Sequence, residues 1–436
     1  MARIADIAQN DHAIWYRLDN AAKIYPALLN AKDSCVFRVA ALLKEVVIPE
    51  HLRQAVIDCK PRFPSFYVKL KTGFFWNYFE DNPEEPLVKP ESHFINQHID
   101  VQKNNGYHFT VFYYEKRISL EAFHSLCDGV GALEFLKAII FRYFERLGYA
   151  MDSENQVLTV DQMPDQAEIE DGFARYYLPT CRNRCRVNRA YRIQGSRLPG
   201  QGDIGVINGK MQVEPFLRLA RNSQATLTQY LTALLTYCIS LDERASVSER
   251  PVNISIPVNL RAMHPSRTLR NFSLFFYTST QGLSKNPDFS AILEQVKEGF
   301  RQELNDDKLQ QNLNANVAIE RSIALRMCPL FIKNIAIRIA CGYLGSKMAT
   351  STMSNMGRVS LPSSMLERVE DFECNMSVGN RATHNVCVIS YGDKMTISCS
   401  RAVYETDLER RFFTYLAAQG LDIEIQSNLR ENLEKG

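Results

Sequence analysis

The sequence predicts an α/β protein with two lobes of similar size. Segments rich in β-branched and aromatic residues, which favour strands, alternate along the 436 residues with segments whose apolar residues recur at helical spacing. Residues 181–203 (CRNRCRVNRAYRIQGSRLPGQGD) combine glycine, proline and six arginines without a sustained period, as is typical of a linker. We therefore expect an N-terminal lobe over residues 1–180, a basic crossover linker over 181–203 and a C-terminal lobe over 204–436.

The N-terminal lobe is predicted to contain two hairpins and two helices. In chain order we expect a strand at 35–47, a helix at 49–59, a hairpin at 66–79, a second hairpin with strands at 107–114 and 118–124, and a helix at 132–147. The second hairpin is the clearest of these elements, because two strand-like runs flank a short polar turn at residues 115–117.

The C-terminal lobe is predicted to alternate in the same way. Strands are expected at 206–211, 252–259, 348–353, 386–390 and 395–400. Helices are expected at 215–221, 226–241, 288–303, 313–344, with a break near Cys328 and Pro329, and 407–417.

The most informative stretch is His-Ser-Leu-Cys-Asp-Gly at residues 124–129. It places His124 at the end of the second hairpin, and Asp128 and Gly129 at the entrance of the following helix. A neutral imidazole with a pKa near the working pH can take a proton from a hydroxyl, amine or thiol, and such a base contributes about 10²–10⁴ in rate. His124 is therefore our candidate general base.

Asp128 has two roles open to it. It can orient the imidazole, or it can be structural and either cap the helix or pair with an arginine. A four-residue separation across a tight turn does not ensure contact with His124, so we favour the structural role. Strand alternation directs Ser125 and Cys127 away from His124, which argues against either as a nucleophile.

The His-x-x-x-Asp-Gly pattern resembles that of the acyltransferase superfamily of chloramphenicol acetyltransferase, peptide-synthetase condensation domains, plant BAHD acyltransferases and bacterial alcohol acetyltransferases. Residues 254–261 (ISIPVNLR), followed by Asn271-Phe272, and residues 354–357 (SNMG) are similar to stretches of its second lobe. Residues 15–26 (WYRLDNAAKIYP) look most like the alcohol acetyltransferases. Many members carry two tandem histidines, whereas Phe123 precedes His124 here, which argues against a strict condensation domain.

The resemblance implies two chloramphenicol-acetyltransferase-like lobes, each a mixed sheet with helices, that form a pseudo-dimer around an interlobe tunnel. His124 would lie at the middle of the tunnel, and Asp128 would pair with Arg261 to lock the turn that aims it. Candidates for stabilising the oxyanion or binding substrate are Ser354, Asn355 and, more weakly, Ser273.

By the same resemblance, we expect an acyl-CoA-dependent O-acyltransferase that works by direct transfer. The donor would be acyl-CoA or the phosphopantetheine thioester of an acyl carrier protein, the acceptor an alcohol or amine, and no bound cofactor or metal is expected. Arg197 could hold the donor's phosphates, although a solvated linker needs no such function. Two alternatives stay open: a catalytically silent binding or carrier-docking module, and an amide-forming condensation enzyme.

Composition and charge are those of an ordinary globular protein. The net charge of +2 gives no case for a nucleic-acid partner, and eleven cysteines, mostly in apolar runs, suit reduced thiols in a cytoplasm. Cys181 and Cys185 lack a histidine at metal spacing. Residues 1–10 lack the features of a secretion signal, so we expect a cytoplasmic monomer whose partners are small molecules.

Residues 327–345 (MCPLFIKNIAIRIACGYLG) form the most hydrophobic long segment. Lys333 and Arg338 near its middle each cost about 2.5–3.5 kcal/mol on insertion into a bilayer, so a membrane span is not predicted. We expect a buried helix. The alternative is an amphipathic face that rests on a membrane surface or forms the mouth of the acyl tunnel.

Overall fold

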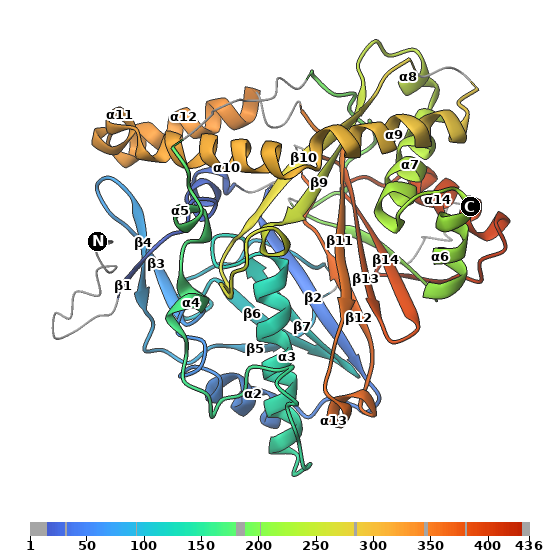
Figure 1. Cartoon of the computed structure of the whole chain (residues 1–436). Coiled ribbons are helices and arrows are strands. Elements are labelled where there is room, and N and C mark those ends of the chain that lie inside the picture. Colours follow the sequence, from blue (N-terminus) through green and yellow to red (C-terminus); the bar gives the residue numbers. More distant parts are fainter. Residues whose placement is uncertain are drawn as a thin grey trace.

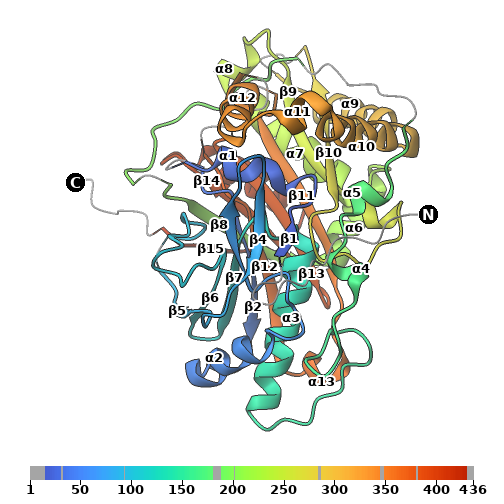
Figure 2. The same cartoon turned by 90° about the vertical axis from the view of Figure 1, so that its left-hand side faces the viewer.

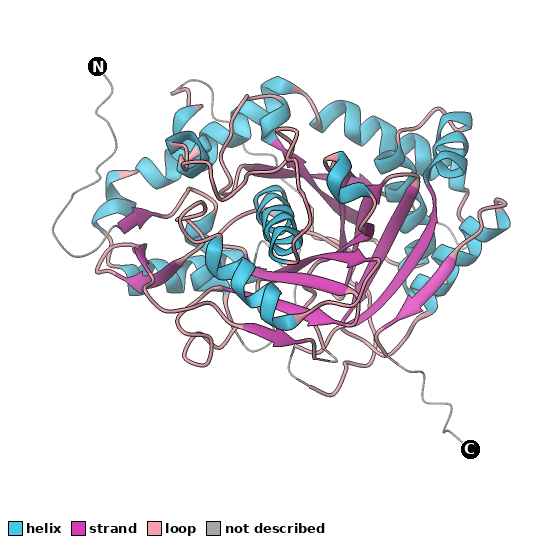
Figure 3. Ribbon diagram, turned by 90° about the horizontal axis from the view of Figure 1, so that it is seen from below, coloured by secondary structure: helices cyan, strands magenta, loops and turns pink. Residues whose placement is uncertain are grey.

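A computed structural model describes residues 15–30, 33–92, 94–179, 188–200, 202–282, 286–343, 348–379 and 382–429. Within these ranges the strands form a five-stranded, a seven-stranded and a three-stranded sheet. Figure 1 shows the two larger sheets side by side, and Figure 3 shows most of the helices around their outer edge.

The five-stranded sheet belongs to the N-terminal half except for one strand. Its order is β12-β2-β7-β6-β5, and helices α2 and α3 belong to the same lobe. The bounds are β2 Val36–Leu43, β5 Val88–Pro90, β6 Phe109–Tyr114, β7 Arg117–Phe123, β12 Val369–Asn375, α2 Pro49–Asp58 and α3 Gly129–Arg146. Apolar side chains of this sheet, α2 and α3 make one large core, so α3 is held firmly where it begins and along most of its length.

The seven-stranded sheet belongs to the C-terminal half and has the order β10-β9-β11-β13-β14-β8-β15. Its strands are β8 Gly205–Gln212, β9 Val252–Asn259, β10 Ser273–Thr280, β11 Ser351–Val359, β13 His384–Tyr391, β14 Lys394–Arg401 and β15 Glu424–Ser427. The helices packed on it are α6 Val213–Asn222, α7 Leu227–Ser240, α9 Phe289–Glu303 and α14 Asp407–Ala418. Thr226 begins α7 with a capping box that includes Gln229.

Strand β12 joins the two halves. It follows the C-terminal strand β11 in sequence, yet it pairs antiparallel with β2 in the N-terminal sheet. Lys210 on β8 forms ion pairs with Asp371 (3.2 Å) and Glu373 (3.0 Å) on β12. The first sheet is therefore completed by residues from the far end of the chain.

The remaining elements are short or peripheral. The three-stranded sheet contains β1 Trp15–Arg17, β4 Asn77–Asp81 and β3 Val68–Thr72. The short helices are η1 Ala22–Ile24, α1 Tyr25–Leu28, α4 Gln166–Ile169, α5 Gly172–Arg175, α8 Glu243–Ser246, η2 Leu260–Ala262 and α13 Ser363–Leu366. Three consecutive helices, α10 Asp306–Arg321, α11 Ile323–Met327 and α12 Leu330–Tyr343, run along one edge of the molecule.

The structure confirms the predicted second hairpin and the helix after it, with the helix starting earlier, at Gly129. It also contains strands that we did not predict, β10 and β12 among them. The helix predicted at 313–344 is three helices, which separate at Ser322 and at the predicted break near Pro329.

The prediction that residues 327–345 form a buried helix is wrong. Met327, Phe331, Ile335 and Ile339 are all more than half exposed, because only the opposite side of α12 packs on the protein. No helix in the described ranges is long and apolar enough to span a membrane.

Candidate active site

His124 lies directly after the end of β7, and elements of the N-terminal half hold its ring. The backbone N–H of His124 donates to the carbonyl of Cys35 at 2.9 Å. The Tyr25 ring stacks on the imidazole at a centroid distance of 4.6 Å, and the Phe37 ring lies 4.9 Å away. His124 is partly buried, and the two aromatic rings fix the plane of its imidazole.

The C-terminal half supplies the hydrogen bond that orients His124. Nδ1 lies 3.0 Å from Oδ1 of Asn271. The amide nitrogen of Asn271 donates to the His124 carbonyl (3.0 Å) and to Oδ2 of Asp19 (3.2 Å). Since the amide nitrogen is used by two acceptors, Oδ1 must accept from Nδ1, and the neutral ring carries its proton there. Nε2 is then left with a free lone pair, as a base requires.

The surroundings keep His124 neutral. Burial lowers the pKa of His124 below its ordinary value, and the nearby Asp128 carboxylate opposes this effect only in part. An imidazole that is neutral near pH 7 is ready to accept a proton.

Asp128 is committed to structural hydrogen bonds. It is the N-cap of α3, where Oδ1 accepts from the N–H of Gly131 at 3.1 Å. Oδ2 accepts from the N–H of Phe272 at 2.9 Å. The predicted ion pair with Arg261 is present and bidentate, with Nη1–Oδ2 2.8 Å and Nη2–Oδ1 3.2 Å. These bonds support the structural role that we favoured for Asp128.

Arg261 also holds the loop that carries Asn271. Its guanidinium donates to the carbonyls of Thr268 (2.9 and 3.0 Å) and Arg270 (2.7 Å). Asp128 holds the same loop from the other side through the N–H of Phe272. The Asp128–Arg261 pair therefore acts on His124 indirectly, because it fixes the backbone on both sides of Asn271.

Glycines at the start of α3 allow close packing against the C-terminal half. A Cβ at Gly129 would lie 2.7 Å from the side chain of Met356 on β11, and a Cβ at Gly131 would lie 1.9 Å from the Leu269 carbonyl oxygen. Gly129, which the sequence singled out, thus lets β11 approach the turn that carries His124.

The two candidates on β11, Ser354 and Asn355, lie on opposite faces of the strand. Asn355 donates to the Thr228 hydroxyl of α7 at 2.9 Å and accepts from the N–H of Gly357 at 2.8 Å, so its amide is occupied on the helix-covered face. Ser354 shares a face with Met356, which reaches Gly129. This geometry favours Ser354 over Asn355 as a group near the base.

Ser273 and Arg197 lie in different places. Ser273 is the first residue of β10, two residues after Asn271, and is partly exposed. Arg197 forms an isolated bridge with Val403 and donates to the carbonyl of Gly379 at 3.1 Å. Of the predicted linker, residues 181–187 and 201 lie outside the described ranges, and these include Cys181 and Cys185.

Ser125 and Cys127 follow β7 in a turn, so strand alternation, on which the prediction for them was based, does not apply there. Both side chains are buried, and the Ser125 hydroxyl donates to the carbonyl of Ala22 at 3.0 Å. Burial raises the pKa of the Cys127 thiol well above its usual range. Neither side chain is set up as a nucleophile.

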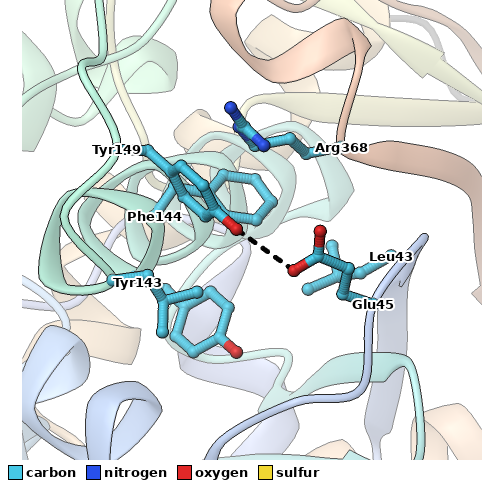
Figure 4. Close-up of a pocket in the computed structure, with 7 residues that line it drawn as sticks. Leu43, Glu45, Tyr143, Phe144, Tyr149 and Arg368 are labelled. Atoms are coloured by element: carbon cyan, nitrogen blue, oxygen red, sulfur yellow. Dashed lines mark hydrogen bonds between the residues drawn. The ribbon is translucent and has the colours of Figure 1, made fainter.

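A small pocket at the far end of α3 is separate from this site. Tyr143, Phe144 and Tyr149 line it together with Leu43 and Glu45 (Figure 4). The Tyr149 hydroxyl donates to Glu45 at 3.1 Å, and the guanidinium of Arg368 lies 3.6 Å from the ring centroid of Tyr149. These contacts join the end of α3 to the chain entering β12. In the described part of the chain, no group of three or more His, Cys, Asp or Glu side chains could hold a metal ion.

Sequence reasoning missed three residues around His124. Asn271 was noted only for resemblance and not as a partner of the imidazole, and Asp19 and Tyr25 were not considered separately. Residues 15–26, which the sequence analysis singled out as a segment, contain both Asp19 and Tyr25, and this segment was the available signal for them.

Comparison with solved structures identifies the fold. Polyketide synthase associated protein 5 from Mycobacterium tuberculosis superposes with a TM-score of 0.58 at 13% identity, covering 92% of this chain and 96% of that one. Trichothecene 15-O-acetyltransferase from Fusarium sporotrichioides gives 0.60 at 10% identity, over 95% and 96%. A mutant starter condensation domain of rhizomide synthetase, in complex with C8-CoA, gives 0.57 at 12% identity, over 93% and 94%.

No protein-family model matches the sequence, and no curated protein matches it. At identities of 10–13% the structural matches establish the fold alone. The chain has the two-lobed, chloramphenicol-acetyltransferase-like fold that a condensation domain and an O-acetyltransferase share, which confirms the predicted fold class.

Proposed function

We propose that this protein is an acyltransferase that moves an acyl group from a thioester donor to an alcohol or amine, with His124 as the general base. The observation that carries the proposal is the bond between Nδ1 of His124 and Asn271, which leaves the lone pair of Nε2 available to accept a proton. The neighbours named above, an O-acetyltransferase and a condensation domain seen with C8-CoA, support acyl chemistry on this fold.

The reaction needs no covalent enzyme intermediate. Nε2 of His124 takes the proton of the acceptor hydroxyl or amine while the oxygen or nitrogen attacks the thioester carbonyl. The tetrahedral oxyanion collapses, the carbon–sulfur bond breaks, and the leaving thiolate takes the proton back from the imidazolium. Ser354 is our candidate donor to the oxyanion, since it shares a strand face with Met356 at the α3 entrance, and Ser273 is a second one.

We take acyl-CoA as the donor and an alcohol as the acceptor, with the two substrates entering a tunnel between the lobes from opposite ends. A carrier-bound phosphopantetheine thioester is the alternative donor and an amine the alternative acceptor. Arg197 stays a candidate for the donor's phosphates, because its guanidinium fork matches phosphate geometry. Asp128, Gly129 and Arg261 support the site without touching substrate.

The test is a mass-spectrometric screen of acyl-CoA donors of graded chain length against mixed alcohols and amines. We expect an ester product, and the His124→Ala variant should form it about 10²-fold more slowly or worse. His98→Ala, at an exposed histidine, is the matched control and should keep wild-type turnover.

Two outcomes would contradict the assignment. A folded His124→Ala variant with wild-type turnover would remove the base. Tight binding of acyl-CoA without any product from either acceptor class would favour the catalytically silent docking module. A product formed only with amines would instead identify the amide-forming enzyme.

A further inference from the structure

Helix α12 is oriented with its apolar side toward solvent. Leu330 and Lys333 face the protein and are 6% and 1% exposed. Phe331, Ile335 and Ile339 face outward and are 64%, 54% and 56% exposed. A helix on the surface of a protein in water normally has the reverse arrangement, with its apolar stripe toward the core.

Specific contacts fix this orientation. The Lys333 ammonium donates to the carbonyl of Phe75 at 2.8 Å and lies 3.7 Å from the ring centroid of Trp76. The N–H of Leu330 donates to the carbonyl of Phe74 at 2.8 Å, so the β3–β4 turn holds the start of α12. Arg338 donates through Nε to the carbonyl of Ala27 on α1 at 2.8 Å. A rotation of α12 that buried its isoleucines would break all of these contacts.

The exposed apolar surface extends beyond α12. Ile323 and Met327 on α11 are 79% and 68% exposed, and Phe74 at the β3–β4 turn is 70% exposed. We call these residues together the α12 patch: Phe74, Ile323, Met327, Phe331, Ile335 and Ile339. Figures 1 and 2 both place α11 and α12 at one edge of the molecule. An apolar surface of this kind is characteristic of a site that meets another apolar phase or a partner.

The charged residues within α11 and α12, and in the chain just before and after them, are all basic from residue 321 to residue 366. Arg321, Arg326, Lys333 and Arg338 are basic, and no aspartate or glutamate occurs in the sequence between Glu320 and residue 367. Glu320 itself is engaged by the Lys23 ammonium at 2.5 Å. In a two-fold contact over this patch, the exposed Arg326 and Arg338 of one copy would face the same basic surface on the other copy, so like charges disfavour that occupant.

We propose that the α12 patch docks the protein on the surface of an anionic phospholipid bilayer. The isoleucines and Phe331 would enter the boundary between head groups and acyl chains, while the exposed arginines meet lipid phosphates and carboxylates. The helix lies on the membrane and does not cross it. The docking is separate from the proposed acyl transfer and does not depend on it.

The test is flotation of the full-length protein with vesicles of phosphatidylcholine alone and of phosphatidylcholine mixed with phosphatidylserine. Wild-type protein should float with the mixed vesicles, float less with phosphatidylcholine, and be released in part by added salt. The variant Phe331→Ser/Ile335→Asn/Ile339→Asn should lower the bound-to-free ratio by about tenfold or more. Val247→Asn is the control and should bind like wild type. Val247 is an apolar residue that is 70% exposed, and it directly follows α8 as its C-cap.

Trp76 gives a second readout on the intact protein. It is one of two tryptophans in the chain, so a Trp15→Phe variant leaves it as the sole indole next to α12. Vesicles that contain brominated phosphatidylcholine should quench its fluorescence.

Three results would overturn the proposal. They are failure of the wild-type protein to float with mixed vesicles, unchanged flotation of the folded triple variant, and a stable dimer in solution that the triple variant dissociates. The last result would assign the α12 patch to a second copy of the chain.

Discussion

Removal of Asp128 and Arg261, singly and together, tests whether the two residues act as one structural unit. Asp128→Ala deletes the N-cap of α3 and leaves two buried partners, the Arg261 guanidinium and the N–H of Phe272, without their acceptor. Arg261→Ala leaves the Asp128 carboxylate without its counter-charge and frees the loop carbonyls of Thr268 and Arg270. The side chains of the pair are only 10% and 5% exposed.

The expected magnitude follows from these contacts. Loss of the cap costs about 1 kcal/mol, and a buried N–H without an acceptor costs about 1–3 kcal/mol. Because each single substitution leaves one buried charge without its partner, each should lower the free energy of unfolding by about 3–5 kcal/mol. The double variant buries no lone charge, so its free energy of unfolding should fall by about 2–3 kcal/mol less than the sum of the single losses.

The free energy of unfolding is measured by urea titration followed by circular dichroism. Arg267→Ala is the matched control, because Arg267 pairs with Asp165 at 2.8 Å but is 65% exposed. It should change stability by about 1 kcal/mol at most. Single losses that add up in the double variant would refute the coupling, and losses no larger than that of Arg267→Ala would refute the buried pair.

Three further predictions follow from the site. Because burial lowers the pKa of His124, the acid limb of kcat/KM should lie at lower pH than that of an ordinary histidine. Asn271→Asp puts a carboxylate on Nδ1 and should move this limb to higher pH, and an unmoved limb in pH–rate profiles would exclude the contact. Gly131→Ala, whose Cβ would meet the Leu269 carbonyl, should lower the melting temperature, whereas Gly299→Ala on α9, 3.3 Å from Thr278, should leave it unchanged or higher. Steady-state rates with donor and acceptor both varied should give intersecting double-reciprocal lines. The Cys127→Ala variant should stay active, because burial raises the pKa of this thiol. An acyl adduct on Cys127 in intact-mass spectra would contradict direct transfer.

Local patterns in the sequence were sufficient for the turn that carries His124. The hairpin, the histidine at its end and the helix after Asp128 depend on residues that are close in sequence, so periodicity and capping describe them. The pairing of Asp128 with Arg261 spans 133 residues and came from the resemblance to a known fold and not from any pattern.

The parts that sequence reasoning missed depend on distant contacts. Asn271 meets His124 across 147 residues, and nothing in its neighbourhood distinguishes it from any loop asparagine. For residues 327–345, hydrophobicity indicated burial, but the contacts of Lys333 with Phe75 and Trp76 decide which side of α12 faces inward. No property of the segment by itself contains that information.

The pairing of β12 with β2 in the N-terminal sheet has a consequence for how the protein folds during synthesis. During synthesis, β2 emerges early but acquires its outer neighbour only after residue 375 has been added. Until then β2 is an edge strand with an almost wholly apolar, buried-type sequence, the kind of edge that pairs with other chains. The first sheet is therefore complete only when nearly the whole polypeptide has been made, and we expect a chain cut at the basic linker to leave β2 and β12 without each other in two separate fragments.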